Sequence, residues 1–122
     1  MDEVSVSAAT TLFEYDASAQ NPVPRSREVS PEEYDVERSP ASVLAGGTAR
    51  ENATILRNIL SGDDRSPRRD VVVLNAAYAL HVSDQFSDID ACLEAAEESI
   101  DSGAALDTLK SLANVSQKAK SE

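Results

Sequence analysis

Four helix-start signals follow one another after residue 29, and they constrain the fold more than any other feature of the sequence. Each places Ser or Thr directly before a helical pattern, at Ser30, Thr48, Ser66 and Ser87. At Ser30 and Thr48 a Glu follows three residues later, so that side chain and backbone can exchange hydrogen bonds in a capping box. Gly62 and Gly103 end two of the patterns, as expected of left-handed residues after a helix. The second half of the chain is therefore predicted to be a succession of helices.

The most buried of these helices is expected between residues 67 and 82. Its run Val71–Leu74 is followed by further apolar residues on other faces, so that the pattern is apolar nearly all round. The neighbouring helices show a single apolar stripe each. Aromatic residues make up only 4% of the chain, so its core must consist mainly of aliphatic side chains, which is typical of packed helices. At 122 residues one domain with a real core is expected.

Before residue 30 the patterns are typical of strands. Val4–Ser7 alternates apolar and polar residues, and residues 10–15 repeat the alternation less cleanly. Residues 16–27 include two prolines and suit an exposed connection. Glu28–Val29 is a short extended stretch that would return as a hairpin partner.

These patterns together predict an α/β fold, with a short β segment of two or three strands followed by a cluster of about four longer helices. Residues 1–29 form the β segment in this prediction, and residues 30–115 form the helical part of the same domain. Residues 116–122 have nothing to bury and are expected to be a polar tail.

The net charge of −11 and the pI near 4.4 argue against binding to nucleic acid or to an anionic membrane, because both partners are themselves negative. A single cysteine, Cys92, cannot form an internal disulfide, so a reducing compartment is the default. No apolar run approaches the roughly 20 residues that span a bilayer, and Met1–Glu3 is acidic where a secretory signal would be basic. We therefore expect a cytoplasmic protein.

Several separate blocks of the sequence occur together in one known family. They are Asp2–Ser7 with Thr10, Leu12 and Glu14; Ser30–Tyr34; Gly46–Ala53; Pro67–Asp70 leading into Leu74–Ala77; and Ala95–Leu106. In this order and spacing the chain resembles the C-terminal part of anthranilate phosphoribosyltransferases, from Met1 to about Leu112. The resemblance implies a large domain of the nucleoside-phosphorylase and phosphoribosyltransferase type. It also implies transfer of the phosphoribosyl group of 5-phosphoribosyl 1-pyrophosphate (PRPP) to anthranilate in tryptophan biosynthesis.

Other parts of the family's pattern do not occur in these 122 residues. They are the glycine-rich Gly-Thr-Gly-Gly-Asp loop that binds PRPP, the Lys-His-Gly-Asn segment, the arginine that contacts anthranilate, and the helical domain through which family members dimerise. We therefore expect a fragment of the enzyme that is inactive alone, with the complete enzyme a homodimer through a domain outside this chain.

The resemblance implies one site in this chain, a magnesium site formed by Asp2 and Glu3. Mg²⁺ prefers hard oxygen ligands and is usually held by one or two carboxylates together with waters and phosphates. There it can neutralise charge on the departing pyrophosphate. Without the resemblance, the two carboxylates would be interpreted as solvated surface charge, as we interpret Asp63–Asp64 and Glu97–Glu98. No catalytic residue and no substrate-binding residue are predicted in this chain.

Four other features have a structural and a functional interpretation, and we favour the structural one for each. His81 would interact with the last carbonyls of its helix rather than act as a general base. Cys92 would be a small core residue rather than a reactive thiol. Gly46–Gly47 would be a tight turn rather than an anion site. Arg68–Arg69 would pair with neighbouring aspartates, Asp63, Asp64 or Asp70, rather than face a phosphate.

Two other functions stay open at this point. One is a stand-alone, non-catalytic helical interaction module, and the other is a fragment of a related pyrimidine nucleoside phosphorylase. A nucleic-acid-binding relative is disfavoured by the acidic charge. Coding sequence upstream of Met1 with an in-frame Gly-Thr-Gly-Gly-Asp block would favour the enzyme.

Overall fold

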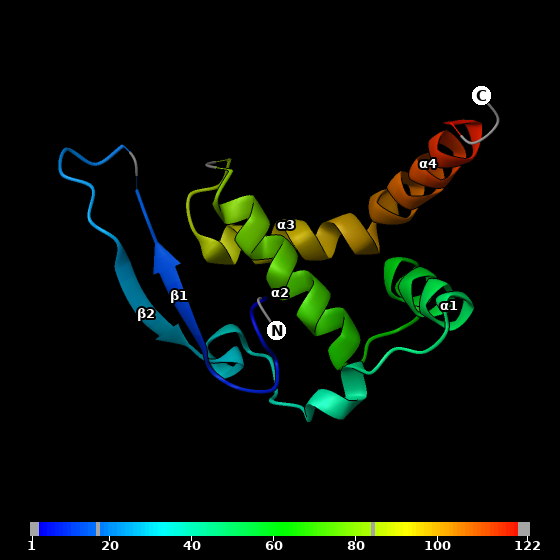
Figure 1. Ribbon diagram of the computed structural model, residues 1–122, viewed down its shortest axis with the longest axis horizontal. Helices are drawn as coiled ribbons and strands as arrows, with labels where there is room; N and C mark the ends of the chain where they lie inside the picture. Colours follow the sequence, from blue (N-terminus) through cyan, green and yellow to red (C-terminus); the bar gives the residue numbers. More distant parts are fainter. Residues whose placement is uncertain (1–2, 17, 84, 120–122) are drawn as a thin grey trace.

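The computed structural model describes residues 3–16, 18–83 and 85–119, and shows a two-stranded hairpin followed by a cluster of helices (Figure 1). The elements are β1 (Thr10–Glu14), β2 (Arg25–Val29), the 3₁₀ turns η1 (Pro31–Tyr34) and η2 (Ala41–Leu44), and the helices α1 (Ala49–Leu60), α2 (Pro67–His81), α3 (Ile89–Asp101) and α4 (Ala104–Ala119). The predicted order, a short β segment before four longer helices, is confirmed.

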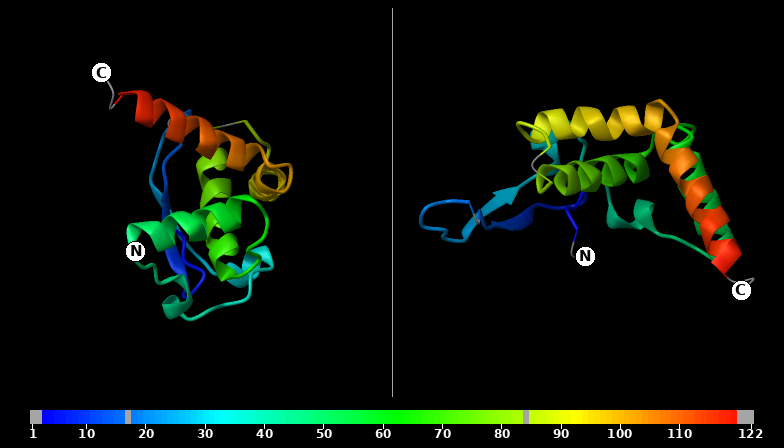
Figure 2. Two further views of the ribbon diagram at one scale, coloured as in Figure 1. Left: turned by 90° about the vertical axis from the view of Figure 1, so that its right-hand side faces the viewer. Right: turned by 90° about the horizontal axis from the view of Figure 1, so that it is seen from above.

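The hairpin is antiparallel and only its base belongs to the core. Thr10 lies opposite Val29 at the base, and Glu14 lies opposite Arg25 toward the tip. Val29 is buried, whereas Phe13 is 78% exposed. The strands therefore project from one side of the helical cluster (Figures 1 and 2).

Val4–Ser7 is not a strand, and the prediction of a strand there is wrong. Both valines are buried, as the alternation implied. The backbone of this segment, however, bonds to side chains and to the Ser39 N–H instead of to a neighbouring strand. The N–H and C=O groups of Val4 bind the Asn75 side chain, and the Ser5 N–H donates to the Thr10 hydroxyl at 3.0 Å. Alternation reports burial, but a strand also needs a partner backbone.

Helix α2 lies at the centre of the molecule, between the hairpin and the other helices, and α3 packs beside it (Figures 1 and 2). Two buried clusters meet on it. The first contains Val4, Val6, Val29 and Leu74, and the second contains Ile59, Val73, Ala96 and Ile100. The prediction that this helix is the most buried element is confirmed.

The predicted helix starts are correct in part. Thr48 caps α1 and forms its capping box with Glu51, and Ser66 accepts a hydrogen bond at the start of α2. Ser30 opens only the single turn η1, because the backbone turns left-handed at Asp35 with φ 56°. Ser87 is not the cap of α3. The carboxylate of the next residue, Asp88, accepts from the Ala91 N–H at 2.9 Å, and the Ser87 hydroxyl donates to that carboxylate.

The helix ends follow the glycines, and the last helix is longer than expected. Gly62 and Gly103 have φ of 78° and 83°, the left-handed region that favours glycine. Helix α4 continues through Ala119, so the expected polar tail is helical over its first residues. It extends away from the cluster with exposed side chains, among them Leu112 and Val115. Within the described part of the chain, no helix combines the length and hydropathy that crossing a membrane requires.

Candidate functional site

One of the two predicted magnesium ligands, Glu3, is the first residue that the structure describes. Asp2 lies outside the described residues, and Glu3 is exposed. In the described ranges, no group of three or more His, Cys, Asp or Glu side chains is arranged to hold a metal ion. Two adjacent carboxylates, of which Glu3 faces solvent, are nevertheless a donor set that suits Mg²⁺, since this ion keeps several water or phosphate ligands beside one or two carboxylates.

The residue after this pair is held firmly. Asn75, in the middle of α2, accepts from the Val4 N–H through Oδ1 at 2.9 Å and donates to the Val4 carbonyl through Nδ2 at 2.9 Å. The Val4 side chain is buried in the first core cluster. Two backbone hydrogen bonds and a buried side chain therefore fix the chain one residue beyond Glu3.

The rest of this segment is tied down by other elements. The Ser7 N–H donates to the Ser5 hydroxyl at 3.0 Å, and the carbonyl of Val6 accepts from the Ser39 N–H at 2.9 Å. Val6 itself is fully buried. The exposed Glu3 is thus followed by a segment whose position is set by α2 and by the loop after η1.

A polar cluster joins the hairpin to α2. The hydroxyls of Tyr34 and Tyr78 share a 2.5 Å hydrogen bond, and the Arg27 guanidinium donates to both at 3.4 Å. Burial, with help from the bond to Tyr34, raises the pKa of the Tyr78 hydroxyl above its ordinary value. The Tyr78 hydroxyl therefore stays protonated at neutral pH, and the cluster acts as a cross-link between β2, η1 and α2.

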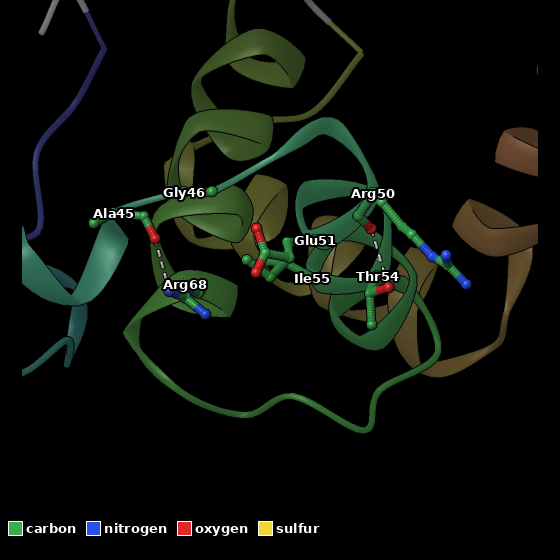
Figure 3. Close-up of a pocket in the computed structure, with 8 residues that line it drawn as sticks. Ala45, Gly46, Arg50, Glu51, Thr54, Ile55 and Arg68 are labelled. Atoms are coloured by element: carbon green, nitrogen blue, oxygen red, sulfur yellow. Dashed lines mark hydrogen bonds between the residues drawn. The ribbon is translucent and has the colours of Figure 1, made fainter.

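A pocket of about 550 Å³ lies where the loop before α1 meets the starts of α1 and α2 (Figure 3). Gly46, Arg50, Glu51 and Arg68 are among the residues that line it. Two backbone donors of the loop that leads into this helix are already used. The Gly47 N–H donates to Asn52 and the Thr48 N–H donates to Glu51, both at 2.7 Å. This geometry agrees with the interpretation of Gly46–Gly47 as a turn, and neither Glu3 nor Asn75 lines the pocket.

The two arginines at the start of α2 do not pair with the neighbouring aspartates, and that prediction is wrong. Arg68 donates instead to two backbone carbonyls of the η2 region, to Val43 at 2.9 Å and to Ala45 at 2.8 Å. These carbonyls lie at the end of a 3₁₀ turn, where the backbone has free acceptors. Arg68 therefore anchors η2 to the start of α2.

Arg69 is buried and reaches across to α3. Its guanidinium lies 3.5 Å from the Glu97 carboxylate and 3.2 Å from the Asp101 carboxylate. Glu97 is therefore not merely solvated charge, as the sequence suggested, although its side chain, like that of Glu98, is exposed. Asp70 lies next to Arg69 in the chain, yet burial raises the pKa of its carboxyl.

The structure agrees with the interpretation of Cys92 and differs in one respect for His81. Cys92 is fully buried, and burial raises the pKa of its thiol, so that a reactive thiolate is disfavoured. His81 is the last residue of α2, as expected. Its Nδ1 atom, however, is buried without a hydrogen-bond partner, so this atom does not bind the last carbonyls of the helix.

Sequence reasoning assigned no role to Asn75, Arg27 or Tyr78. One signal was available for Asn75, because a polar amide within an otherwise apolar helical run needs a buried partner. The partner of that amide, Val4, lies 71 positions away and has no local signature in the sequence.

One known family matches the chain over residues 1–106, and it is described as the glycosyl transferase family, a/b domain. The chain belongs to this family. The match includes the acidic pair, the hairpin and most of the helical cluster of this glycosyl transferase domain.

Similar proteins agree on one member of the family. The anthranilate phosphoribosyltransferase of Salinibacter ruber is 73% identical over 122 residues, which are all of this chain and 36% of that protein. The Saccharomyces cerevisiae enzyme, solved in complex with 4-fluoroanthranilate, is 30% identical with a TM-score of 0.77 over 90% of this chain and 31% of its own. The same enzyme in complex with PRPP and Mg is 29% identical, with a TM-score of 0.75 over 90% of this chain and 30% of its own. The chain thus spans about a third of the length of the relatives it matches.

Proposed function

We propose that this chain forms part of an anthranilate phosphoribosyltransferase and supplies magnesium ligands to its active site. The observation that carries the proposal is the 73% identity with the Salinibacter ruber enzyme across every position of the chain. The yeast structure with PRPP and Mg supports the choice of cofactor and substrate. Residues 1–29 and 30–115 would belong to one large domain, which their shared core around Leu74 supports, followed by the segment 116–122.

In this proposal the chain contributes position and charge and does not contribute a nucleophile or a base. The carboxylates of Asp2 and Glu3 would hold Mg²⁺, which when bound neutralises charge on the leaving pyrophosphate. The hydrogen bonds of Val4 to Asn75 fix the backbone directly after Glu3. Anthranilate would be bound by groups outside this chain, and its amine would attack C1 of the ribose as the pyrophosphate leaves. Orientation and electrostatics would be the main catalytic contributions.

Dimerisation of the complete enzyme and its cellular location stay predictions. A complete enzyme would dimerise through a part outside these residues, as the resemblance implies. A cytoplasmic location is proposed because Cys92 is a buried free thiol, which suits a reducing compartment.

The proposal can be tested in a chimera that uses the high identity. The segment of the Salinibacter ruber enzyme that matches this chain is replaced by Met1–Glu122, and formation of phosphoribosyl anthranilate is measured with and without Mg²⁺. We expect turnover that requires PRPP, anthranilate and the metal. The isolated chain should show none, because the expected phosphate loop and anthranilate contacts are not in its sequence.

An Asp2→Ala, Glu3→Ala double variant of the chimera gives the site-specific control. It should lose most of the turnover, and added Mg²⁺ should restore it only in part. The matched control is an Asp63→Ala, Asp64→Ala variant, which removes an adjacent acidic pair of equal charge elsewhere in the chain. Turnover that is unaffected by loss of Asp2 and Glu3 would remove them from the site, and a folded but inactive chimera would contradict the proposed function.

A further inference from the structure

Asn75 holds the backbone directly after the acidic pair from both sides. Its Oδ1 accepts from the Val4 N–H at 2.9 Å, and its Nδ2 donates to the carbonyl of Val4 at 2.9 Å and to that of Val71 at 2.8 Å. One amide side chain therefore takes both backbone groups of Val4, as the backbone of a neighbouring strand would do. The third bond, to α2 itself, fixes which way the amide faces.

The site of this amide is costly, which argues that the contact has a use. Asn has a lower helix propensity than Leu or Ala, which flank it, and a half-buried amide that loses its partners destabilises the fold. The neighbours Val73 and Leu74 of the same helix are buried and purely apolar. Packing alone would be satisfied by an apolar residue at position 75.

The contact lies next to the proposed metal ligands in the chain. Val4 follows Glu3 directly, so its N–H belongs to the peptide group whose carbonyl is that of Glu3. A hydrogen bond to this N–H restricts the rotation of that peptide plane and with it the direction in which Glu3 leaves the backbone. The buried side chain of Val4 anchors the other side. Helix α2 can thus determine where the exposed Glu3 carboxylate stands.

We propose that Asn75 is a positioning residue for the magnesium site, holding Val4 so that the Glu3 carboxylate directly before it meets the metal in one geometry. The inference rests on the proposed function and adds to it a residue on another element. Groups that orient metal ligands usually matter for affinity, and their loss typically weakens metal binding or activity about 10- to 100-fold.

The chain contains a matched control for this inference. Asn52 makes the same two-sided contact with another backbone, since its Oδ1 accepts from the Gly47 N–H at 2.7 Å and its Nδ2 donates to the Gly47 carbonyl at 3.2 Å. It lies in α1 and does not touch the segment that carries the acidic pair. Loss of Asn52, which is exposed, therefore removes the two corresponding backbone hydrogen bonds without disturbing Val4.

The experiment uses the chimera described above, with the variants Asn75→Leu, Asn75→Ala and Asn52→Ala. Binding of Mn²⁺, a paramagnetic substitute for Mg²⁺, is measured by electron paramagnetic resonance in the presence of PRPP. Turnover is measured as a function of Mg²⁺ and of anthranilate, and exchange of the Val4 amide is followed by mass spectrometry. We expect both Asn75 variants to bind Mn²⁺ about tenfold more weakly, to need more Mg²⁺, and to keep the KM for anthranilate. Asn52→Ala should leave all three unchanged, and the Val4 amide should exchange faster only in the Asn75 variants.

Four other outcomes of these measurements would contradict the positioning role of Asn75, and each can be distinguished from the others. Unchanged Mn²⁺ binding in the Asn75 variants of an active chimera would overturn the positioning role and leave the proposed function standing. Equal weakening in Asn52→Ala would show a general loss of stability instead of positioning. Loss of helical circular dichroism in both Asn75 variants at the assay temperature would make the residue a folding determinant only. A chimera with Asn75 intact that neither binds Mn²⁺ nor turns over would overturn the proposed function and the positioning role together.

Discussion

Single polar residues on α2 connect the parts of this molecule. Asn75 reaches the N-terminal segment, Tyr78 reaches η1, and Arg69 reaches α3. The sequence could indicate that such residues need partners, because they interrupt an apolar pattern. It could not indicate which partners, since these are set by tertiary geometry. The candidate metal ligands are a stronger case, because an adjacent acidic pair has no local signature and only the family resemblance singled out Asp2 and Glu3.

In the ion-pair cluster around Arg69, removing the acids should lower the free energy of unfolding more than removing the arginine. The guanidinium is 9% exposed, whereas the Glu97 and Asp101 carboxylates are 53% and 41% exposed. Replacing both acids by Ala leaves a buried cation without a partner and should cost roughly 2–3 kcal/mol of unfolding free energy. Arg69→Met should cost less, because water can solvate the remaining carboxylates. Urea unfolding measures both.

A Glu94→Ala, Glu98→Ala variant is the control for this comparison. It changes the charge of α3 by the same amount at two exposed residues that make no ion pair in the described part of the chain. We expect it to change the unfolding free energy by less than about half a kcal/mol. A larger cost for Arg69→Met than for the double acid variant would contradict the asymmetry.

At the scale of elements, local signals predicted the boundaries and nonlocal contacts decided the exceptions. The ends of α1 could be predicted because Thr48 and Gly62 act through hydrogen bonds and φ angles within a few residues of themselves. The backbone conformation of Val4–Ser7 could not be predicted, because alternation indicates burial and does not say whether a strand or a side chain satisfies the backbone hydrogen bonds. At Ser87 two good capping residues stand side by side, and Asp88 is the one that reaches the free N–H.

The capping box of α1 can be tested by removing its hydroxyl. Thr48 Oγ1 accepts from the Glu51 N–H at 3.3 Å, so Thr48→Ala should destabilise the protein by about 1 kcal/mol. Thr54→Ala makes the same chemical change inside the same helix, where the hydroxyl bonds only to the Arg50 carbonyl. It should be neutral or slightly stabilising, because Ala has the higher helix propensity. Thermal melts followed by circular dichroism compare the two, and equal losses would argue against a role of the cap.

The same capping box predicts how the stability difference between Thr48→Ala and the parent protein changes at low pH. Hydrogen bonds from the Thr48 side chain and backbone hold the pKa of the Glu51 carboxyl below its ordinary 4.5. A carboxyl whose pKa is lower in the folded state contributes stability above the ordinary pKa and loses it as the pH falls through the lowered value. The destabilisation of Thr48→Ala relative to the parent protein should therefore shrink in that acid range. A difference that grows with acid would contradict this sign.

At the scale of the whole molecule, the N-terminal segment, the base of the hairpin and the other helices pack against α2 through the two buried clusters. The hairpin tip and α4 extend outward (Figure 1). Leu74 is fully buried, and Leu112 on α4 is 64% exposed. Leu74→Asp places an unpaired carboxylate in the core, at a cost of several kcal/mol, comparable with the whole stability of a small domain. We expect this variant to lack a cooperative melt, whereas Leu112→Asp should melt close to the parent protein. Similar melts for both would contradict the central place of α2.

Hydrogen exchange should show a gradient along the β segment instead of one uniform rate. A two-stranded hairpin by itself is marginal in water, so the amides near its tip, in residues 18–24, should exchange fastest. The base is different, because Val29 is buried and the Val4 N–H is bonded to Asn75. These two amides should exchange slowly, approaching the protection of the amides around Leu74, which open only with the core. Mass spectrometry of the exchanging chain resolves the three regions. Fast exchange at Val4 as well as at the tip would show that the N-terminal segment detaches without unfolding the helices, and that α2 does not hold the backbone after Glu3 in place.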